Sequence, residues 1–98
     1  MSTETVLKKN VLIVNMRGLH ARAAAKFMKL AAQYKCEIIV SRNGTEVPGR
    51  SLMGLLTLGA SKGKDIDIVC DGVDAEQALA ALADLVERGF DEDDGDGV

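Results

Sequence analysis

The stretch VLIVNMRGLHARAAAKFMKLAAQY, residues 11–34, contains the pattern that decides the fold. Residues 11–14 are consecutive apolar residues before a glycine-containing loop at 15–19, which predicts a buried strand. Between 21 and 34, apolar residues recur three and four positions apart, as in an amphipathic helix; they are Ala24, Phe27, Met28, Leu30, Ala31 and Tyr34. This region is therefore predicted to be a strand, a loop and a helix with one apolar face.

The chain on the C-terminal side of this unit continues the alternation of strands and helices. The predicted elements are a strand at 36–42, a hairpin turn at Asn43-Gly44, a returning strand at 45–47, a short helix at 52–58, a strand at 65–70 and a last helix that stops near Gly89. Ser51 is a candidate N-cap of the short helix. Asp74 and Gln77 are expected to form a capping box at the start of the last helix.

The order of these elements, β-α-β-β-α-β-α, predicts an α+β fold. Each helix has a single apolar stripe, so all helices should cover one face of a four-stranded, mostly antiparallel sheet in a two-layer structure. With 98 residues, 47% of them hydrophobic, the chain is long enough for one domain, at 1–90. The acidic residues that follow, in 91–98, predict a solvated, disordered tail to which no chemistry is assigned.

Composition argues against several classes of function. Aromatic residues make up 3% of the chain, which is poor in the stacking platforms that bind nucleic acid. No apolar stretch approaches the length of a membrane span, and the first residues do not resemble a signal peptide, so we expect a cytoplasmic protein without stable membrane insertion. Cys36 and Cys70 lack metal-ligand spacing and should be buried, reduced thiols. We expect no metal and no cofactor.

His20 is the only histidine and lies between the glycine-containing loop and the first predicted helical turn. The first amides of a helix lack partners and its N-terminus carries positive partial charge, so an anion is stabilised there. A neutral imidazole can attack phosphorus and is then readily displaced. Arg22, and Arg17 from the loop, can donate to phosphate oxygens, and Gly18 leaves room for the approach. Taken alone, a histidine at this position is more often a cap or a surface residue.

Two motifs carry a resemblance to a known family. Gly18-Leu19-His20-Ala21-Arg22 resembles the active-site signature of HPr, the histidine-containing phosphocarrier family of the bacterial phosphotransferase system, and SLMGLLTLG at 51–59 resembles its second motif. The resemblance extends from about 11 to about 89. It implies an HPr-like open-faced β-sandwich with an antiparallel sheet in the order 1-4-2-3 and three helices on one face. Ala23 stands where the family usually has proline, which leaves the branch of the family open.

The resemblance also implies the chemistry of the site. His20 would accept a phosphoryl group from phosphorylated enzyme I, on the ring nitrogen that faces the helix N-terminus, and pass this pros-phosphohistidine phosphate to a IIA domain. Arg22 would stabilise the transferring charge, with Arg17, Gly18 and Ala21 as supporting residues. The chain would then be a carrier rather than a stand-alone enzyme.

Ser51 has a structural and a regulatory interpretation. A serine N-cap is common, so a purely structural role is the default. In many members of the resembling family, however, the matching serine is the target of HPr kinase/phosphorylase, and Met53-Gly54 resembles those members. Phosphate on Ser51 would place about two negative charges beside a surface meant for acidic partners, so loading from enzyme I should fall.

The same surface is a candidate docking site. Leu52, Met53 and Leu56 are expected to form a partly exposed apolar centre, and Arg22, Lys26 and Lys29 a basic rim. Ordinary core packing and a solvated basic face are the alternatives. The chain is expected to be a monomer that carries phosphate in a sugar-transport or a nitrogen-related pathway. The competing hypothesis is a regulatory binding module of the same fold that acts through contacts gated by Ser51.

Overall fold

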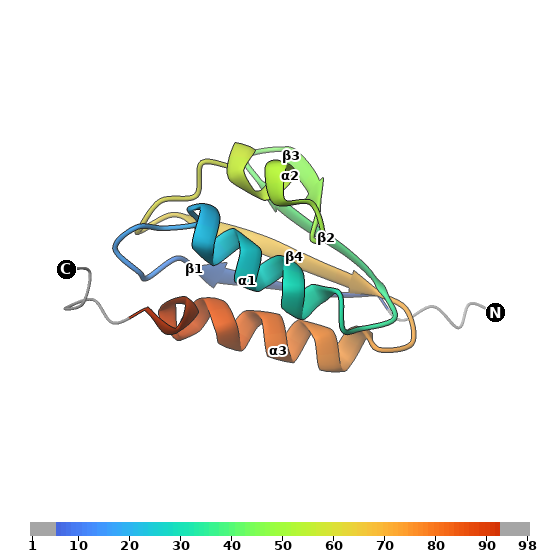
Figure 1. Ribbon diagram of the computed structural model, residues 1–98. Helices are drawn as coiled ribbons and strands as arrows, with labels where there is room; N and C mark the ends of the chain where they lie inside the picture. Colours follow the sequence, from blue (N-terminus) through green and yellow to red (C-terminus); the bar gives the residue numbers. More distant parts are fainter. Residues whose placement is uncertain (1–5, 93–98) are drawn as a thin grey trace.

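The computed structural model describes residues 6–92, in which strands and helices alternate along the chain as predicted (Figure 1). The elements are β1 (Val6–Leu12), α1 (Ala21–Ala31), β2 (Glu37–Arg42), β3 (Thr45–Pro48), α2 (Leu52–Thr57), β4 (Asp65–Asp71), α3 (Ala75–Glu87) and a 3-10 turn, η1 (Gly89–Asp91). Among these described residues, no helix has the length and apolar character needed to cross a membrane.

The four strands form one antiparallel sheet in the order β1-β4-β2-β3, which confirms the predicted fold class. β4 lies inside the sheet and pairs along its whole length with β1, from Val6 opposite Asp71 to Leu12 opposite Asp65. β2 and β3 are joined by the predicted hairpin turn, where Asn43 and Gly44 have φ angles of 51° and 83°. The tight positive-φ pair is the backbone geometry that an Asn-Gly turn provides.

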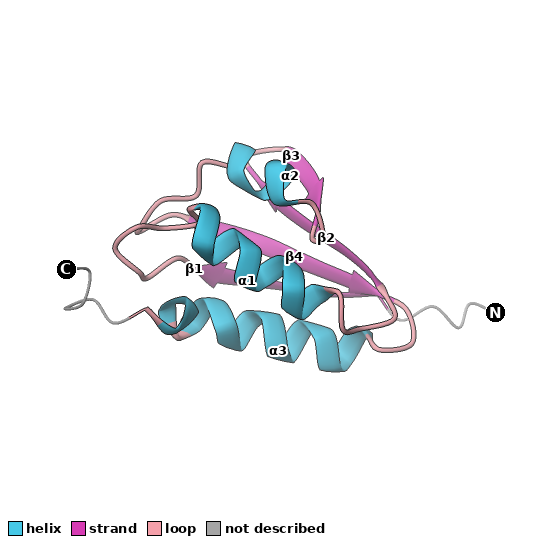
Figure 2. Ribbon diagram, in the orientation of Figure 1, coloured by secondary structure: helices cyan, strands magenta, loops and turns pink. Residues whose placement is uncertain are grey.

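All three helices cover the same face of the sheet, and the opposite face is open (Figure 2). The alternation along β4 sets this arrangement, because Ile66, Ile68 and Cys70 are buried under the helices while their neighbours point to the open face. α1 contacts both α2 and α3. The core between the layers includes the completely buried Phe27, Leu55, Leu82 and Phe90.

Two predicted elements have different boundaries in the structure. β1 spans Val6–Leu12 rather than 11–14. It begins earlier because it is an edge strand whose polar residues Lys8, Lys9 and Asn10 can pair with β4 and still face solvent. α1 ends at Ala31 rather than at residue 34. Past that end, the Arg50 guanidinium donates to the backbone oxygens of the turn, namely those of Ala31, Tyr34 and Cys36.

Two local predictions about side chains also need correction. Asp74 is the N-cap residue of α3, but within residues 6–92 the capping box with Gln77 is not formed. Instead the Asp74 carboxylate accepts a hydrogen bond of 2.7 Å from the Lys35 amide and ties the loop after α1 to the start of α3. Cys70 is buried as expected, whereas Cys36 lies just before β2 and is only half-buried. Both cysteines are free thiols.

Candidate functional site

His20 is the N-cap residue of α1. Its backbone is extended, with φ −87° and ψ −177°, and its side chain turns back over the first helical turn so that Nδ1 accepts a hydrogen bond of 3.3 Å from the Arg22 amide. The His20 carbonyl accepts the first intrahelical bond, from the Ala24 amide at 2.8 Å. The imidazole thus occupies the position in which N-cap side chains satisfy the free amides of a helix.

The loop before His20 is held against the segment that follows α2. Gly18 has a φ of 67°, and a Cβ at this position would lie 2.6 Å from the Ala60 carbonyl oxygen. The same oxygen accepts a hydrogen bond of 2.9 Å from the Leu19 amide. Glycine is therefore required here both for its left-handed backbone and for its lack of a side chain, and its close packing fixes the backbone on which His20 stands.

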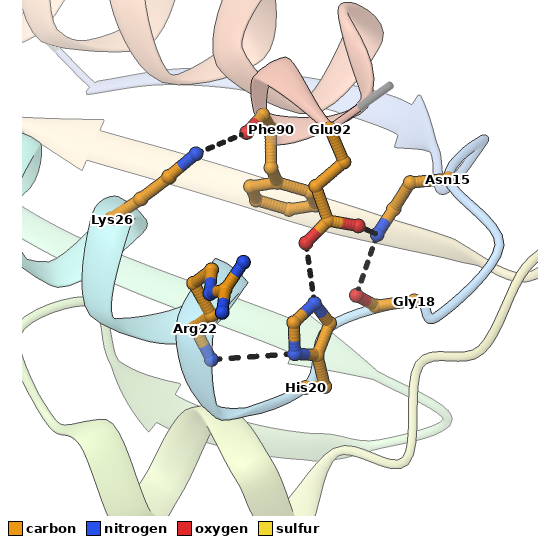
Figure 3. A network of polar contacts seen from close by, with 7 residues as sticks. All are labelled: Asn15, Gly18, His20, Arg22, Lys26, Phe90 and Glu92. Carbon is orange, nitrogen blue, oxygen red and sulfur yellow. Dashed lines mark hydrogen bonds and ion pairs between the residues drawn. The ribbon is translucent and has the colours of Figure 1, made fainter. Parts of the chain in front are cut away.

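A carboxylate from the other end of the chain contacts the imidazole. Glu92 Oε2 lies 2.5 Å from His20 Nε2, and Glu92 Oε1 accepts a hydrogen bond of 2.9 Å from Asn15 Nδ2 (Figure 3). Asn15 is buried and its Nδ2 also donates to the Gly18 carbonyl at 2.9 Å. Glu92 belongs to the acidic segment 91–98 that was predicted to be a solvated tail, yet it is half-buried and contacts His20. Residues 93–98 of that segment lie outside the described residues.

The backbone before Glu92 is fastened over α1. Phe90 is completely buried, and Lys26 Nζ donates a hydrogen bond of 2.8 Å to the Phe90 carbonyl (Figure 3). Phe90 and Asp91 both have positive φ angles, 58° and 61°, which are uncommon for residues other than glycine. The buried aromatic ring and the lysine contact outweigh that backbone cost and direct the chain toward His20.

The two ring contacts of His20 specify its neutral tautomer. Nδ1 accepts from a backbone amide, so its lone pair is directed at the N-terminus of α1. Nε2 must then carry the proton and donate it to the Glu92 carboxylate. Burial alone would raise the pKa of Glu92, but hydrogen bonds from Asn15 and His20 and the charges of His20 and Arg17 outweigh burial and lower the pKa. Glu92 is therefore an anion at neutral pH.

The predicted basic residues divide into two groups. Arg17, Arg22 and Lys29 are exposed, and Arg22 lies beside the His20 ring (Figure 3). Lys26, which was expected to contribute to a basic rim, is instead half-buried and engaged with the Phe90 carbonyl. Ala21 is exposed in the first turn of α1. Residues 6–92 contain no cluster of three histidine, cysteine or acidic side chains that could hold a metal ion.

The second motif forms α2 and is capped as predicted. Ser51 Oγ accepts a hydrogen bond of 3.0 Å from the Gly54 amide, and the serine is half-buried. Met53 projects outward with 70% of its surface exposed, while Leu52 and Leu56 are half-buried and pack against the core. In the candidate docking patch, Met53 is therefore the exposed apolar residue, while Leu52 and Leu56 are partly taken up by packing against the core.

Comparison with known proteins connects this geometry to one family. The family model described as PTS HPr component phosphorylation site matches residues 7–88. Phosphocarrier protein HPr of Neisseria meningitidis serogroup A is 45% identical over 87 residues, 89% of this chain and 98% of the relative. Phosphocarrier protein NPr of Shewanella violacea is 41% identical over 88 residues, 90% and 97% of the two chains. The crystal structure of HPr-C-His from Thermoanaerobacter tengcongensis is similar with a TM-score of 0.85 at 37% identity, covering 89% and 98%.

Proposed function

The chain belongs to the HPr family of phosphocarriers of the phosphotransferase system, and we propose that it accepts a phosphoryl group on His20 Nδ1 from phosphorylated enzyme I and passes it to a IIA domain. The observation that carries this proposal is the contact between Nδ1 and the Arg22 amide, which places the lone pair at the N-terminus of α1. We place this exchange in the cytoplasm and expect a monomer, because serial docking needs one free surface.

The proposed step is a direct exchange of phosphorus–nitrogen bonds. His20 Nδ1 attacks the phosphorus of the donor's phosphohistidine, a new P–N bond forms, and the donor's P–N bond breaks with its electron pair returning to the donor ring. The phosphoryl oxygens then lie at the start of α1, where free amides and the helix dipole favour negative charge. The exposed Arg22 guanidinium can donate to the same oxygens, with Arg17 available from the loop.

Incubation with enzyme I and phosphoenolpyruvate tests the assignment. We expect one acid-labile, alkali-stable phosphate on His20, and none on the His20→Ala variant. Arg22→Ala should be phosphorylated more slowly. Lys35→Ala, which removes an exposed charge in the loop after α1, is the matched control for a general loss of basic charge. Full labelling of His20→Ala, or no labelling of the wild type by any cognate enzyme I, would refute the proposal.

Whether the chain acts in the sugar-transport or the nitrogen-related branch can be tested by measuring which enzyme I and IIA domain it reacts with faster. Relatives called HPr and NPr match at similar identity, 45% and 41%. Parallel assays with a sugar-branch and a nitrogen-branch enzyme I, each followed by transfer to its own IIA domain, should show a preference in initial rate. If His20→Ala instead preserves every cellular phenotype, the alternative of a regulatory binding module is favoured over the carrier.

Ser51 is proposed as a regulatory phosphorylation site for HPr kinase/phosphorylase. Its Oγ already accepts from the Gly54 amide at the start of α2, and a phosphate oxygen could accept the same hydrogen bond. About two added negative charges beside the exposed Met53 would oppose docking of acidic partners on Leu52, Met53 and Leu56. Mass spectrometry after incubation with ATP and the kinase should locate phosphate on Ser51; modification solely at Ser41 or Ser61 would contradict this.

A further inference from the structure

Glu92 makes the second polar contact of the His20 ring, on the nitrogen opposite the proposed phosphoryl acceptor. We propose that Glu92 is a positioning residue for phosphoryl transfer, which keeps the ring proton on Nε2 in both the free and the phosphorylated protein. This inference rests on the function proposed for His20 and deepens it. It assigns a role to a residue on the C-terminal side of α3, outside both motifs of the sequence.

The first support is the geometry of the imidazole itself. A neutral histidine has one protonated and one unprotonated nitrogen, and its reactivity depends on which nitrogen has the lone pair. The 2.5 Å contact with the Glu92 carboxylate can be satisfied only by a protonated Nε2. The Arg22 amide, a donor, needs an unprotonated Nδ1. Glu92 and the start of α1 therefore select the same tautomer from opposite sides of the ring.

The second support is the way the carboxylate is held. Asn15, which is 1% exposed, fixes Glu92 Oε1 at 2.9 Å and is itself anchored to the Gly18 carbonyl. Asn15 Oδ1 has no hydrogen-bond partner among the described residues, so the amide is oriented for its two donations at the cost of an unsatisfied oxygen. Buried Phe90 and the contact from Lys26 fix the backbone two residues before Glu92. An exposed acid in a solvated tail would need none of these contacts.

The third support is the chemistry of the next transfer. When phosphate leaves Nδ1, the P–N bond breaks and its electron pair returns to the ring. If Nε2 has kept its proton, the leaving group is neutral imidazole; if Nε2 has lost it, the leaving group is an imidazolate anion, which is a far poorer one. A carboxylate on Nε2 stabilises the positive charge of the protonated phosphoimidazole. Glu92 would thus help Nε2 to retain its proton as the pH rises, so that neutral imidazole remains the leaving group.

Other charged groups near the ring act in the opposite sense or from further away. Arg17 from the loop and Arg22 from α1 are exposed cations that disfavour a positive ring, and the ammonium of Lys26 is engaged with the Phe90 carbonyl. On the segment after α3, Asp91 is paired with Arg88. Among these groups Glu92 is the anion in contact with His20, so its substitution should change the tautomer of the ring more than substitution of Arg17, Arg22 or Asp91.

The test uses the full-length chain and three variants. Glu92→Ala removes the acceptor and Glu92→Gln keeps an acceptor oxygen but removes the charge. Glu76→Gln removes an exposed charge at the start of α3 and is the matched control. Two-bond proton–nitrogen NMR spectra of the His20 ring report the tautomer, and quenched-flow labelling gives the rates of loading from enzyme I and of transfer to a IIA domain between pH 6 and pH 9.

We expect the wild type and Glu76→Gln to have a protonated Nε2. Glu92→Ala should have a mixture of tautomers and, because it loses a hydrogen bond to a charged group, roughly 10-fold slower transfer. Glu92→Gln should keep the tautomer, but its transfer rate relative to wild type should fall as the pH rises. A tautomer and rates within twofold of wild type in Glu92→Ala across this pH range would overturn the proposal. If the wild type is never phosphorylated, both the proposed phosphoryl transfer by His20 and the role of Glu92 in that transfer are refuted. The NMR spectra decide independently whether Glu92 sets the tautomer of the His20 ring.

Discussion

Substitution of Gly18 by alanine tests the packing that supports the site. Two costs follow from the structure. The backbone φ of 67° lies in the left-handed region, where an L-residue with a Cβ costs about 1–2 kcal/mol. The new Cβ would also lie 2.6 Å from the Ala60 carbonyl oxygen and 2.7 Å from Ser61 Cα, both of them backbone atoms that cannot rotate away.

The second cost can be separated from the first by a matched glycine. Gly59 has a φ of 60°, nearly that of Gly18, but a Cβ there would have open space, with no atom within 4 Å apart from those of its own chain neighbours. Gly59→Ala should therefore cost about 1 kcal/mol, for the backbone alone. In Gly18→Ala the displaced Ala60 oxygen also loses the hydrogen bond from the Leu19 amide, and leaving that amide unsatisfied costs about 1–3 kcal/mol more.

Thermal unfolding followed by circular dichroism distinguishes the two variants. For a chain of this size, 1 kcal/mol corresponds to about 4–8 °C in Tm. Gly59→Ala should lower the Tm by about 4–8 °C. Gly18→Ala, which loses about 2–5 kcal/mol in all, should lower the Tm by about 8–40 °C. Urea midpoints should follow the same order with an unchanged m-value. Equal losses of Tm in the two variants would refute the inference that close packing against Ala60, rather than the backbone angle, makes glycine necessary at position 18.

Four further results are expected. Ser51→Ala should cost about 1 kcal/mol in chemical denaturation because the cap of α2 is lost, while Ser51→Asp should retain most of the stability. Truncation of buried Leu55 to alanine should cost about 2–5 kcal/mol, against less than about 0.5 kcal/mol for exposed Met53. The pKa of Glu92 is lowered below its ordinary 4.5 in the folded state. The ionised carboxylate should therefore add to the free energy of unfolding above pH 4.5, and this contribution should vanish as the pH falls through the lowered pKa. Acid titration of wild type and Glu92→Gln measures the contribution, and a difference in stability that persists at pH 2 would contradict it. Burial raises the pKa of Cys70 to about 12, so iodoacetamide at pH 8 should modify Cys70 only after unfolding.

Much of the fold could be predicted because it depends on local patterns. The alternation in β4, the Asn43-Gly44 turn and the Ser51 cap each involve neighbours in sequence, and the structure confirms all three. The start of β1 was missed because an edge strand tolerates polar residues that would break a central one. The bond from the Lys35 amide to Asp74 was missed because it joins residues far apart in sequence, and no periodicity signals such a contact.

In the site, too, features that depend on local sequence could be predicted, and a contact between distant residues could not. His20 could be proposed as the candidate residue from its place before a helix and from the motif around it. Glu92 could not, because it is separated from His20 by 72 positions and lies in a segment whose composition indicates a tail. One signal was available: Phe90 is an apolar residue beyond the stop of α3 at Gly89. A large apolar residue placed after a helix ends often has a buried position, as Phe90 has here.

The sheet order also determines when the parts of this protein can come together during synthesis. β1 leaves the ribosome before the other strands of the sheet, yet its partner β4 ends at Asp71, so β1 stays unpaired until β4 has been made. The β2–β3 hairpin and α2 are local in sequence and can form in the meantime. The contact between the His20 imidazole and its carboxylate partner forms later still, because that partner is residue 92. A nascent chain can therefore assemble its sheet before its histidine is fully oriented.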